Sequence, residues 1–286
     1  MENSTAGNMP LVSSVLHPTD FSPASNRAFA HALAVALIRQ TELTILHVGP
    51  EKNSSVKWTK FPPVRKTLEK WGLLEAGSPR SAIFDEFQVR VSKVAIPSRR
   101  PVLATAAFIE DHPTDLIVLA TEGREGLTRW FNRSDAEAMA RWSNTMTLFV
   151  PGNAKRGLVS PEDGELTLKN ILVPVDAKPD CAAAVEFSRR TAEMLGDDKV
   201  NITLLHVGDN PPPTPGLVEG ERWRILTEHR QGNPVDEILS AADSHAADLI
   251  VMATAGHDGL FDALRGSTTE QVLRGAPCPL LAVPAG

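Results

Sequence analysis

The sequence contains one long segment twice. Residues 115–151 read DLIVLATEGREGLTRWFNRSDAEAMARWSNTMTLFVP, and residues 248–284 read DLIVMATAGHDGLFDALRGSTTEQVLRGAPCPLLAVP. The two segments align without a gap, and about two positions in five are identical. The starts agree as well, because 15–20 matches 171–176 and 43–48 matches 202–207. A sequence repeated at this length predicts two tandem copies of one fold.

Each copy has the pattern of an α/β domain. The apolar run Leu249–Met252 is typical of a parallel strand that is buried on both faces, and a glycine loop and a helix follow it. Residues 153–166 are polar, rich in glycine and proline, and lack periodicity, which predicts a linker. We therefore expect a first domain over residues 10–152 and a second over residues 167–286.

Within the first copy, strands are expected at 12–16, 43–48 and 89–96. Helices are expected from Pro23 to Arg39, near 63–74 and over 102–110. The second copy repeats the strands at 171–175, 202–207 and 222–228, with a helix over 180–195. The prolines of 211–215 forbid a crossover helix there, so we expect the neighbouring domain to cover that flank of the sheet.

The last strands, 147–150 and 280–283, are apolar in both copies. Each would otherwise be an open sheet edge, which favours pairing of the two copies about a pseudo-twofold axis.

The sequence predicts a helix start at Ser267. Ser267 and Glu270 form the S-x-x-E capping box, in which each side chain bonds a free backbone N–H of the first turn. The free N–H groups and the positive end of the helix dipole favour an anion next to the preceding Gly266.

Composition excludes several classes of partner. The net charge is −6 and the pI about 5.8 without a basic stripe, so we expect neither nucleic acid nor a membrane surface as partner. The longest apolar run, Ala32–Ile38, is too short to span a bilayer. The N-terminus lacks the basic and apolar regions of a signal peptide, so a cytoplasmic protein is expected. Cys181 and Cys278 form no CxxC and are interpreted as buried thiols.

No dedicated catalytic motif is present. The sequence lacks a P-loop, G-x-S-x-G, and H-x-x-x-H at a suitable place, so no residue is predicted to be catalytic or to bind metal, and slow ATP hydrolysis stays open. His112 and His245 follow helices and are interpreted as interacting with the last carbonyls. His257 and Asp258 are interpreted as a solvated loop tip.

The motifs PTDFSPAS at 18–25, LLHV at 204–207 and DLIVMAT at 248–254, with the glycine loop and Gly-Ser, resemble the universal stress protein family. The resemblance covers both copies. It implies two tandem Rossmann-like domains, each an open five-stranded parallel sheet flanked by helices. Nucleotide-binding members of that family carry G-x2-G-x9-G-[ST]. The second copy has Ala253, Gly256, Gly266 and Ser267 at these places.

The resemblance also implies a site for ATP or a related adenine nucleotide, with Mg²⁺ left open. The acidic residue for the adenosine end corresponds to Asp176. The full set of implied binding residues is Pro174, Val175, Asp176, Val207, Met252, Ala253, Gly256, Gly266, Ser267, Thr268 and Thr269.

The first copy departs from the pattern. It has Ala120, Gly123, Arg133 and Ser134, so two of three glycines are missing and Arg133 stands where Gly266 stands in the second copy. If this position needs a positive φ, arginine costs roughly 1 kcal/mol or more, and its side chain fills the phosphate site. We therefore expect a nucleotide-binding sensor or regulator with one site, in the second copy. The alternative is a stress-response scaffold that binds no nucleotide, and a homodimer is left open.

Overall fold

The fold was determined as a computed structural model, which describes residues 12–50, 57–121, 145–195, 199–212, 219–254 and 268–285. The first half of the chain contains, in order, β1 (Ser14–Pro18), α1 (Pro23–Arg39), β2 (Glu42–Gly49), the 3-10 helix η2 (Trp58–Lys60), α2 (Val64–Lys70), α3 (Ala82–Phe87), β3 (Arg90–Pro97), α4 (Pro101–Asp111), β4 (Leu116–Thr121) and β5 (Met146–Pro151).

The second half contains, in order, β6 (Asn170–Pro174), α7 (Ala182–Leu195), β7 (Val200–Val207), β8 (Trp223–Arg230), α8 (Pro234–Ser244), β9 (Leu249–Thr254), α10 (Thr268–Gly275) and β10 (Leu280–Pro284). Across the described ranges, no helix combines the length and the apolar character that crossing a membrane requires.

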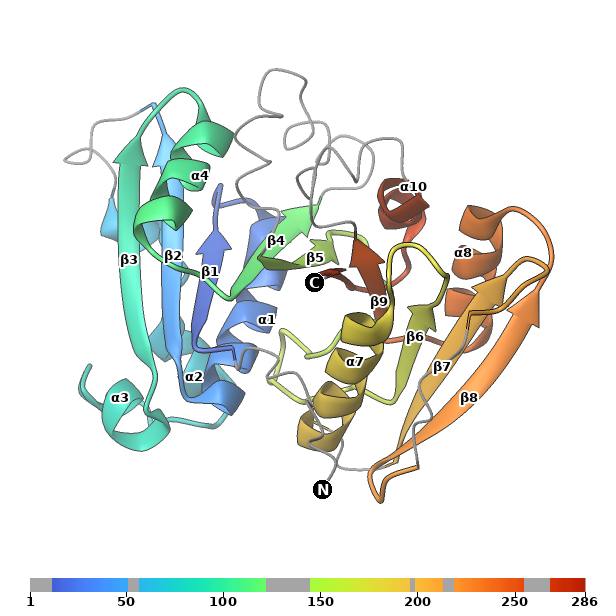
Figure 1. Cartoon of the computed structure of the whole chain (residues 1–286). Coiled ribbons are helices and arrows are strands. Elements are labelled where there is room, and N and C mark those ends of the chain that lie inside the picture. The colour runs from blue at the N-terminus through green and yellow to red at the C-terminus, as the bar shows by residue number, and fades with distance from the viewer. Residues whose placement is uncertain are drawn as a thin grey trace, which may run out of the picture.

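The ten strands in the described ranges form one continuous sheet with the order β3-β2-β1-β4-β5-β10-β9-β6-β7-β8 (Figure 1). Within each half the five strands are parallel, and the order of the second half mirrors that of the first. The prediction of two Rossmann-like α/β units is therefore confirmed, with the addition that their sheets merge.

The two halves join where β5 pairs antiparallel with β10. Leu281 is the register partner of Leu148, and Ala282 is the partner of Thr147. This pairing confirms the predicted contact between the last strands. Since both strands are almost entirely buried, the pairing removes two apolar edges from solvent at once.

The repeated aspartate before β4 and β9 has the same structural role in both halves. The Oδ2 atom of Asp115 accepts hydrogen bonds from the backbone N–H groups of Ser13 and Ser14, at 2.8 and 3.0 Å. Asp248 Oδ2 accepts in the same way from Lys169 and Asn170, also at 2.8 and 3.0 Å. Each carboxylate therefore fixes the start of the first strand of its half beside the fourth.

Two hydrophobic layers cover the two faces of the sheet. One layer contains α1 and α7, with Leu148 and Leu281 from the central strands. The other contains the apolar sides of α4, α8 and α10, with Phe149 and Leu280. Successive strand residues point to opposite faces, so the unbroken apolar runs of β4, β5, β9 and β10 contribute to both layers.

The linker packs against both halves. Arg27 of α1 donates from Nη1 to Ala154 O at 2.8 Å, and Arg156 donates from Nε to Ala247 O at 2.9 Å. Leu158 and Val159 are buried, and Trp71 Nε1 donates to Pro161 O at 3.3 Å. The polar composition of 153–166 indicated a linker, but it gave no sign of these contacts.

The expectation that the first domain covers the open flank of the second sheet is wrong. Because the halves meet through β5 and β10, β8 is the strand of the second half farthest from the first. Its cover is local. The Trp223 ring lies beneath the Arg189 guanidinium of α7, with 6.0 Å between the guanidinium carbon and the ring centroid.

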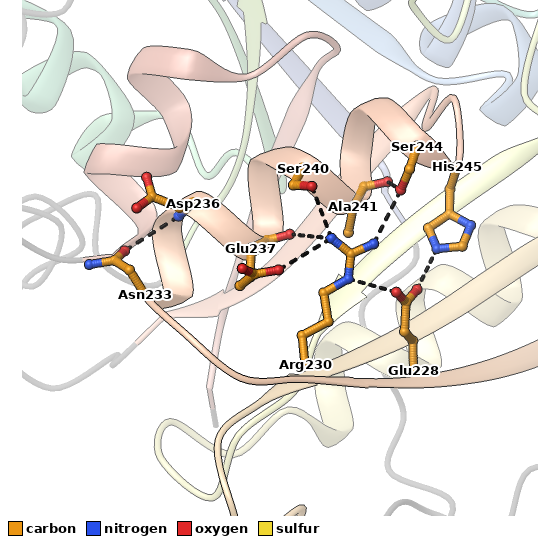
Figure 2. Close-up of polar contacts among 9 residues, drawn as sticks. All are labelled: Glu228, Arg230, Asn233, Asp236, Glu237, Ser240, Ala241, Ser244 and His245. Carbon is orange, nitrogen blue, oxygen red and sulfur yellow. Dashed lines mark hydrogen bonds and ion pairs between the residues drawn. The ribbon is translucent and has the colours of Figure 1, made fainter.

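On its other face, β8 is held by a polar network to α8 (Figure 2). Arg230 Nε donates to Glu228 Oε1 at 2.6 Å, and its Nη atoms donate to Ser240 Oγ and Ser244 Oγ at 3.1 and 3.2 Å. Glu228 also pairs with the ring of His245 at the end of α8. We expected the side chains of His112 and His245 to interact with the last carbonyls of their helices. This is confirmed for His112, whose Nδ1 lies 2.9 Å from Phe108 O. The His245 side chain instead contacts the Glu228 carboxylate.

Two buried histidines connect elements of the first half. His17 Nδ1–H donates to Val118 O at 3.0 Å. His31 Nδ1–H donates to Arg27 O at 2.9 Å, and its Nε2 accepts from the N–H of Leu158 in the linker at 3.3 Å. Burial lowers the pKa of each ring from 6.5 to about 4, so both are neutral near pH 7.

These histidines predict acid sensitivity. Between pH 6.5 and about 4 the unfolded chain binds protons that the folded chain does not, so stability falls as pH falls through that window. We expect a loss of roughly 2 kcal/mol per histidine between pH 7 and 5. Urea unfolding at both pH values tests this, and His31→Gln should show a smaller loss than wild type. An equal loss in both proteins would contradict this role of His31.

The Arg230 network predicts that the stability of the edge strand β8 depends strongly on the Arg230 side chain. Arg230→Met should lower the free energy of unfolding by about 1–2 kcal/mol, because its part-buried partners lose a charged donor. Lysine at this position should recover only part of the loss, since it lacks the planar fork. The control is Arg224→Met on the same strand, which should change stability by less than about 0.5 kcal/mol because Arg224 is exposed. Equal effects of the two methionine variants would argue against the network.

Candidate functional site

The second half contains a pocket at the carboxyl ends of its strands. Segments from β6, β7 and β9 contribute to it, together with the starts of α8 and α10. In open parallel sheets, ligands bind at this edge where the strand order reverses, and here β6 and β9 flank that point.

Eight of the eleven residues implied by the family resemblance line this pocket. They are Pro174, Val175, Asp176, Val207, Met252, Ala253, Thr268 and Thr269. The other three, Gly256, Gly266 and Ser267, lie outside the described residues, as do His257 and Asp258. The pocket therefore brings together residues from four separate stretches of the chain.

The chain leaving β6 is fixed at the rim of the pocket. The backbone N–H of Val175 donates to Leu205 O of β7 at 2.8 Å, which continues the strand pairing by one residue. Asp176 comes next and is exposed, with its Oδ1 accepting from the N–H of Ala177 at 2.7 Å. This local bond orients the carboxylate and leaves its other oxygen available to hydroxyl groups of a ligand.

The apolar part of the lining comes from β7 and β9. Met252 is buried, while Ala253 and Val207 are half-buried. These side chains give the pocket an apolar lining beside the Asp176 carboxylate. Such a combination suits a planar ring joined to a polyhydroxyl group.

The described part of α10 begins at Thr268, and the predicted cap Ser267 lies outside the described residues, so the helix start at Ser267 stays a prediction. Thr269 is buried and Thr268 half-buried, so both hydroxyls and the N–H groups of the first turn lie beside the pocket. The partner of Glu270 in the box, Ser267, lies outside the described residues. Glu270 Oε1 also accepts from Arg274 Nη2 at 2.5 Å.

Sequence reasoning missed part of the lining. The additional residues are Lys178, Pro179, Cys181, Leu205, Pro234 and Ile238. Pro234 and Ile238 belong to α8, whose start is capped by Asn233, and the N–P pair at 233–234 was an available signal for it. Lys178 is exposed and adds a cation to the rim.

The corresponding region of the first half differs at the end of β1. Phe21, with φ of 64°, stands where the second half has Ala177, and its ring stacks on His47 with 4.0 Å between centroids. Phe61 meets Phe21 edge-on at 5.3 Å. Ala120, the next-to-last residue of β4, is half-buried, while Gly123, Arg133 and Ser134 lie outside the described residues.

Neither cysteine nor any acidic cluster forms a metal site in the described parts of the chain. No group of three or more His, Cys, Asp or Glu side chains is suitably placed there. Cys181 and Cys278 are free and buried, which confirms the interpretation from sequence.

Comparison with known proteins gives consistent matches. The model of the Universal stress protein family matches residues 12–151 and 223–284. A universal stress protein of Methanocaldococcus jannaschii is 29% identical over 147 residues, which cover 42% of this chain and 85% of that protein. A universal stress protein A homologue of Coxiella burnetii is 28% identical over 141 residues, 40% of this chain and 95% of the relative.

A solved structure covers both halves. The universal stress protein from Archaeoglobus fulgidus matches 96% of this chain and 99% of its own, with a TM-score of 0.60 and 16% identity. At this identity the match shows the fold, including the arrangement of two halves.

The two cysteines should differ in reactivity. Cys181 lines the pocket, whereas Cys278 is completely buried and its thiol pKa is raised by burial to about 12. Iodoacetamide should therefore modify Cys181 at least tenfold faster than Cys278 in the native protein, as measured by peptide mass spectrometry. In denaturant the two rates should become similar. Faster labelling of Cys278 in the native protein would contradict the placement of the pocket.

Proposed function

Because the chain belongs to the universal stress protein family, we propose that its second half binds ATP or a related adenine nucleotide. In this proposal the protein is a cytoplasmic nucleotide sensor or regulator rather than a dedicated enzyme. The observation that carries it is the convergence of residues implied by the family resemblance, from four separate stretches, on one pocket.

Each part of the pocket has a distinct task in this proposal. Val175, Val207 and Met252 contact the adenine ring, and the Asp176 carboxylate accepts hydrogen bonds from the ribose hydroxyls. The phosphates lie at the start of α10, where Thr268, Thr269 and the free N–H groups donate to them. Gly256, Gly266 and Ser267 complete this phosphate site, and Lys178 contributes a positive charge at the rim.

The pocket supports binding better than chemistry. Asp176 is the only carboxylate among the described residues that line it, and none of them is a histidine. A pair of carboxylates, or a carboxylate with a histidine, of the kind that general acid–base catalysis commonly uses is therefore missing from this part of the lining. The protein thus reports the nucleotide concentration through its bound state.

The proposed site is confined to the second half. In the first half Arg133 replaces the glycine at the phosphate position, and Phe21 with its stacked His47 replaces Ala177 at the end of the first strand. Both replacements put bulk where the second half has a small residue.

Titration with ATP by calorimetry tests the proposal. Wild type should bind one ATP, Gly266→Arg should bind none, and Arg133→Gly should bind one or two. Asp176→Ala should weaken binding about tenfold or more, because a charged hydrogen bond contributes roughly 1.5–3 kcal/mol. The matched control is Asp20→Ala at the equivalent position of the first half, which should bind like wild type.

Two results would overturn the proposal. Unchanged ATP binding in Gly266→Arg would remove the second half as the site. Absence of binding in wild type, with ATP, ADP, AMP and cyclic AMP each at millimolar concentration, would favour the scaffold alternative. Mass spectrometry of small molecules released by denaturing the purified protein would identify the bound nucleotide directly.

A further inference from the structure

A second pocket lies at the seam between the two halves, on the sheet face that α1 and α7 cover. Its floor consists of four leucines, Leu116, Leu148, Leu249 and Leu281. Residues 116 and 249 are repeat equivalents, as are 148 and 281, and the last two are register partners in the β5–β10 pairing. The pocket therefore straddles the pseudo-twofold axis of the molecule.

The walls are apolar as well. Val35 and Ile38 of α1 form one side, and Phe187 and Met194 of α7 form the other. The volume of the cavity is about 110 Å³. A cavity needs roughly 10–15 Å³ of such volume to hold one water molecule. The space therefore corresponds to on the order of seven to eleven waters, or a similar number of methylene groups. An apolar chain fits this space, whereas a folded protein segment such as a helix is too wide for it.

Two arginines, Arg39 of α1 and Arg190 of α7, also line this apolar pocket. Arg39 Nη1 donates to the thioether sulfur of Met194 at 3.0 Å, and its Nε is buried without a hydrogen-bond partner. No carboxylate is paired with Arg39 in the parts of the chain that the structure describes. A thioether is a weak acceptor, so among the described residues the hydrogen bonds of this guanidinium include no strong side-chain acceptor.

The nearby carboxylate is already engaged. Glu186 accepts from Arg190 Nε at 2.7 Å and from Arg189 Nη2 at 2.8 Å. A buried N–H without a partner is unfavourable, and a guanidinium fork matches a carboxylate with two parallel hydrogen bonds. The seam thus combines an apolar space large enough for an alkyl chain with an arginine that has no carboxylate partner among the residues described.

We propose that the seam pocket binds a single-chain amphipathic carboxylate, that is, a fatty acid of medium length. The alkyl chain lies between α1 and α7 on the leucine floor, and the carboxylate lies on the Arg39 guanidinium near Met194, which is 42% exposed at this side of α7. Such a ligand contacts both halves at once. Its binding therefore stabilises their pairing, and this site is separate from the pocket at the strand ends of the second half.

Calorimetric titration of the full chain with dodecanoate, kept below its micelle concentration, tests the proposal. Wild type should bind one dodecanoate with micromolar affinity, and the melting temperature should rise with its concentration. Dodecanol and dodecyltrimethylammonium, which have the same chain without the negative charge, should bind at least tenfold more weakly.

Variants test the contributions of the alkyl chain and of the carboxylate of the ligand separately. Arg39→Gln should weaken dodecanoate binding at least tenfold and leave dodecanol binding unchanged. The matched control Arg90→Gln removes an exposed arginine of β3, whose side chain is 68% exposed, and should bind like wild type. Ile38→Trp should fill the pocket and abolish binding of both compounds. If Ile38→Trp does not fold, Met194→Trp at the exposed end of the pocket replaces it.

Three outcomes would overturn the proposal. One is absence of dodecanoate binding to wild type up to its solubility limit. Another is equal binding to wild type, Arg39→Gln and the tryptophan variant. The third is binding that occurs only after deletion of residues 1–11, which precede the pocket residue Val12, because the occupant would then be the chain's own N-terminal segment.

Discussion

The antiparallel pairing of β5 with β10 determines how the two halves are arranged. Each half ends its parallel sheet in a short strand that is apolar on both faces, and such an edge is unfavourable in water. Pairing the two edges joins the sheets into one and relates the halves by a pseudo-twofold axis. The pairing also decides which strands remain at the ends, namely β3 and β8. It creates the seam on which α1 and α7 face each other across four leucines.

The two halves use one scaffold but stabilise their outer strands differently. In the first half, α2 and its neighbours supply Phe61, Leu68 and Trp71 to the core beside β2 and β3. In the second half, the described residues between β7 and β8 form no such helix, and β8 is held by Trp223 beneath Arg189 and by the Arg230 network to α8. A polar network of this kind stabilises the fold only when all its partners are present, because a buried polar group that loses its hydrogen bond destabilises the folded state.

The linker, together with the buried His31, forms a second connection between the halves. His31 lies in α1 of the first half, yet its ring accepts a hydrogen bond from the linker at Leu158. Arg156 of the same linker donates to the carbonyls of Ala242 near the end of α8 and of Ala247, which lies between α8 and β9. The halves are thus held together by strand pairing on one side and by linker contacts on the other, so relative motion as free domains is opposed.

The sequence by itself determined the duplication, the fold class and the pairing of the last strands, and it named eight of the residues that line the pocket at the strand ends of the second half. These features depend on local patterns, namely apolar runs, capping residues and repeated motifs, which persist in any context. Ile238 was missed because α8 reaches the pocket only through packing. Lys178 and Leu205 lie two residues from the predicted Asp176 and Val207, and only the folded geometry shows that they also line the pocket. Helix α3 was missed for lack of a clear periodic pattern. The cover of β8, the packed linker and the seam pocket were decided only by the tertiary structure. Each arises from contacts between residues far apart in sequence, and such contacts leave no periodic signal in the chain.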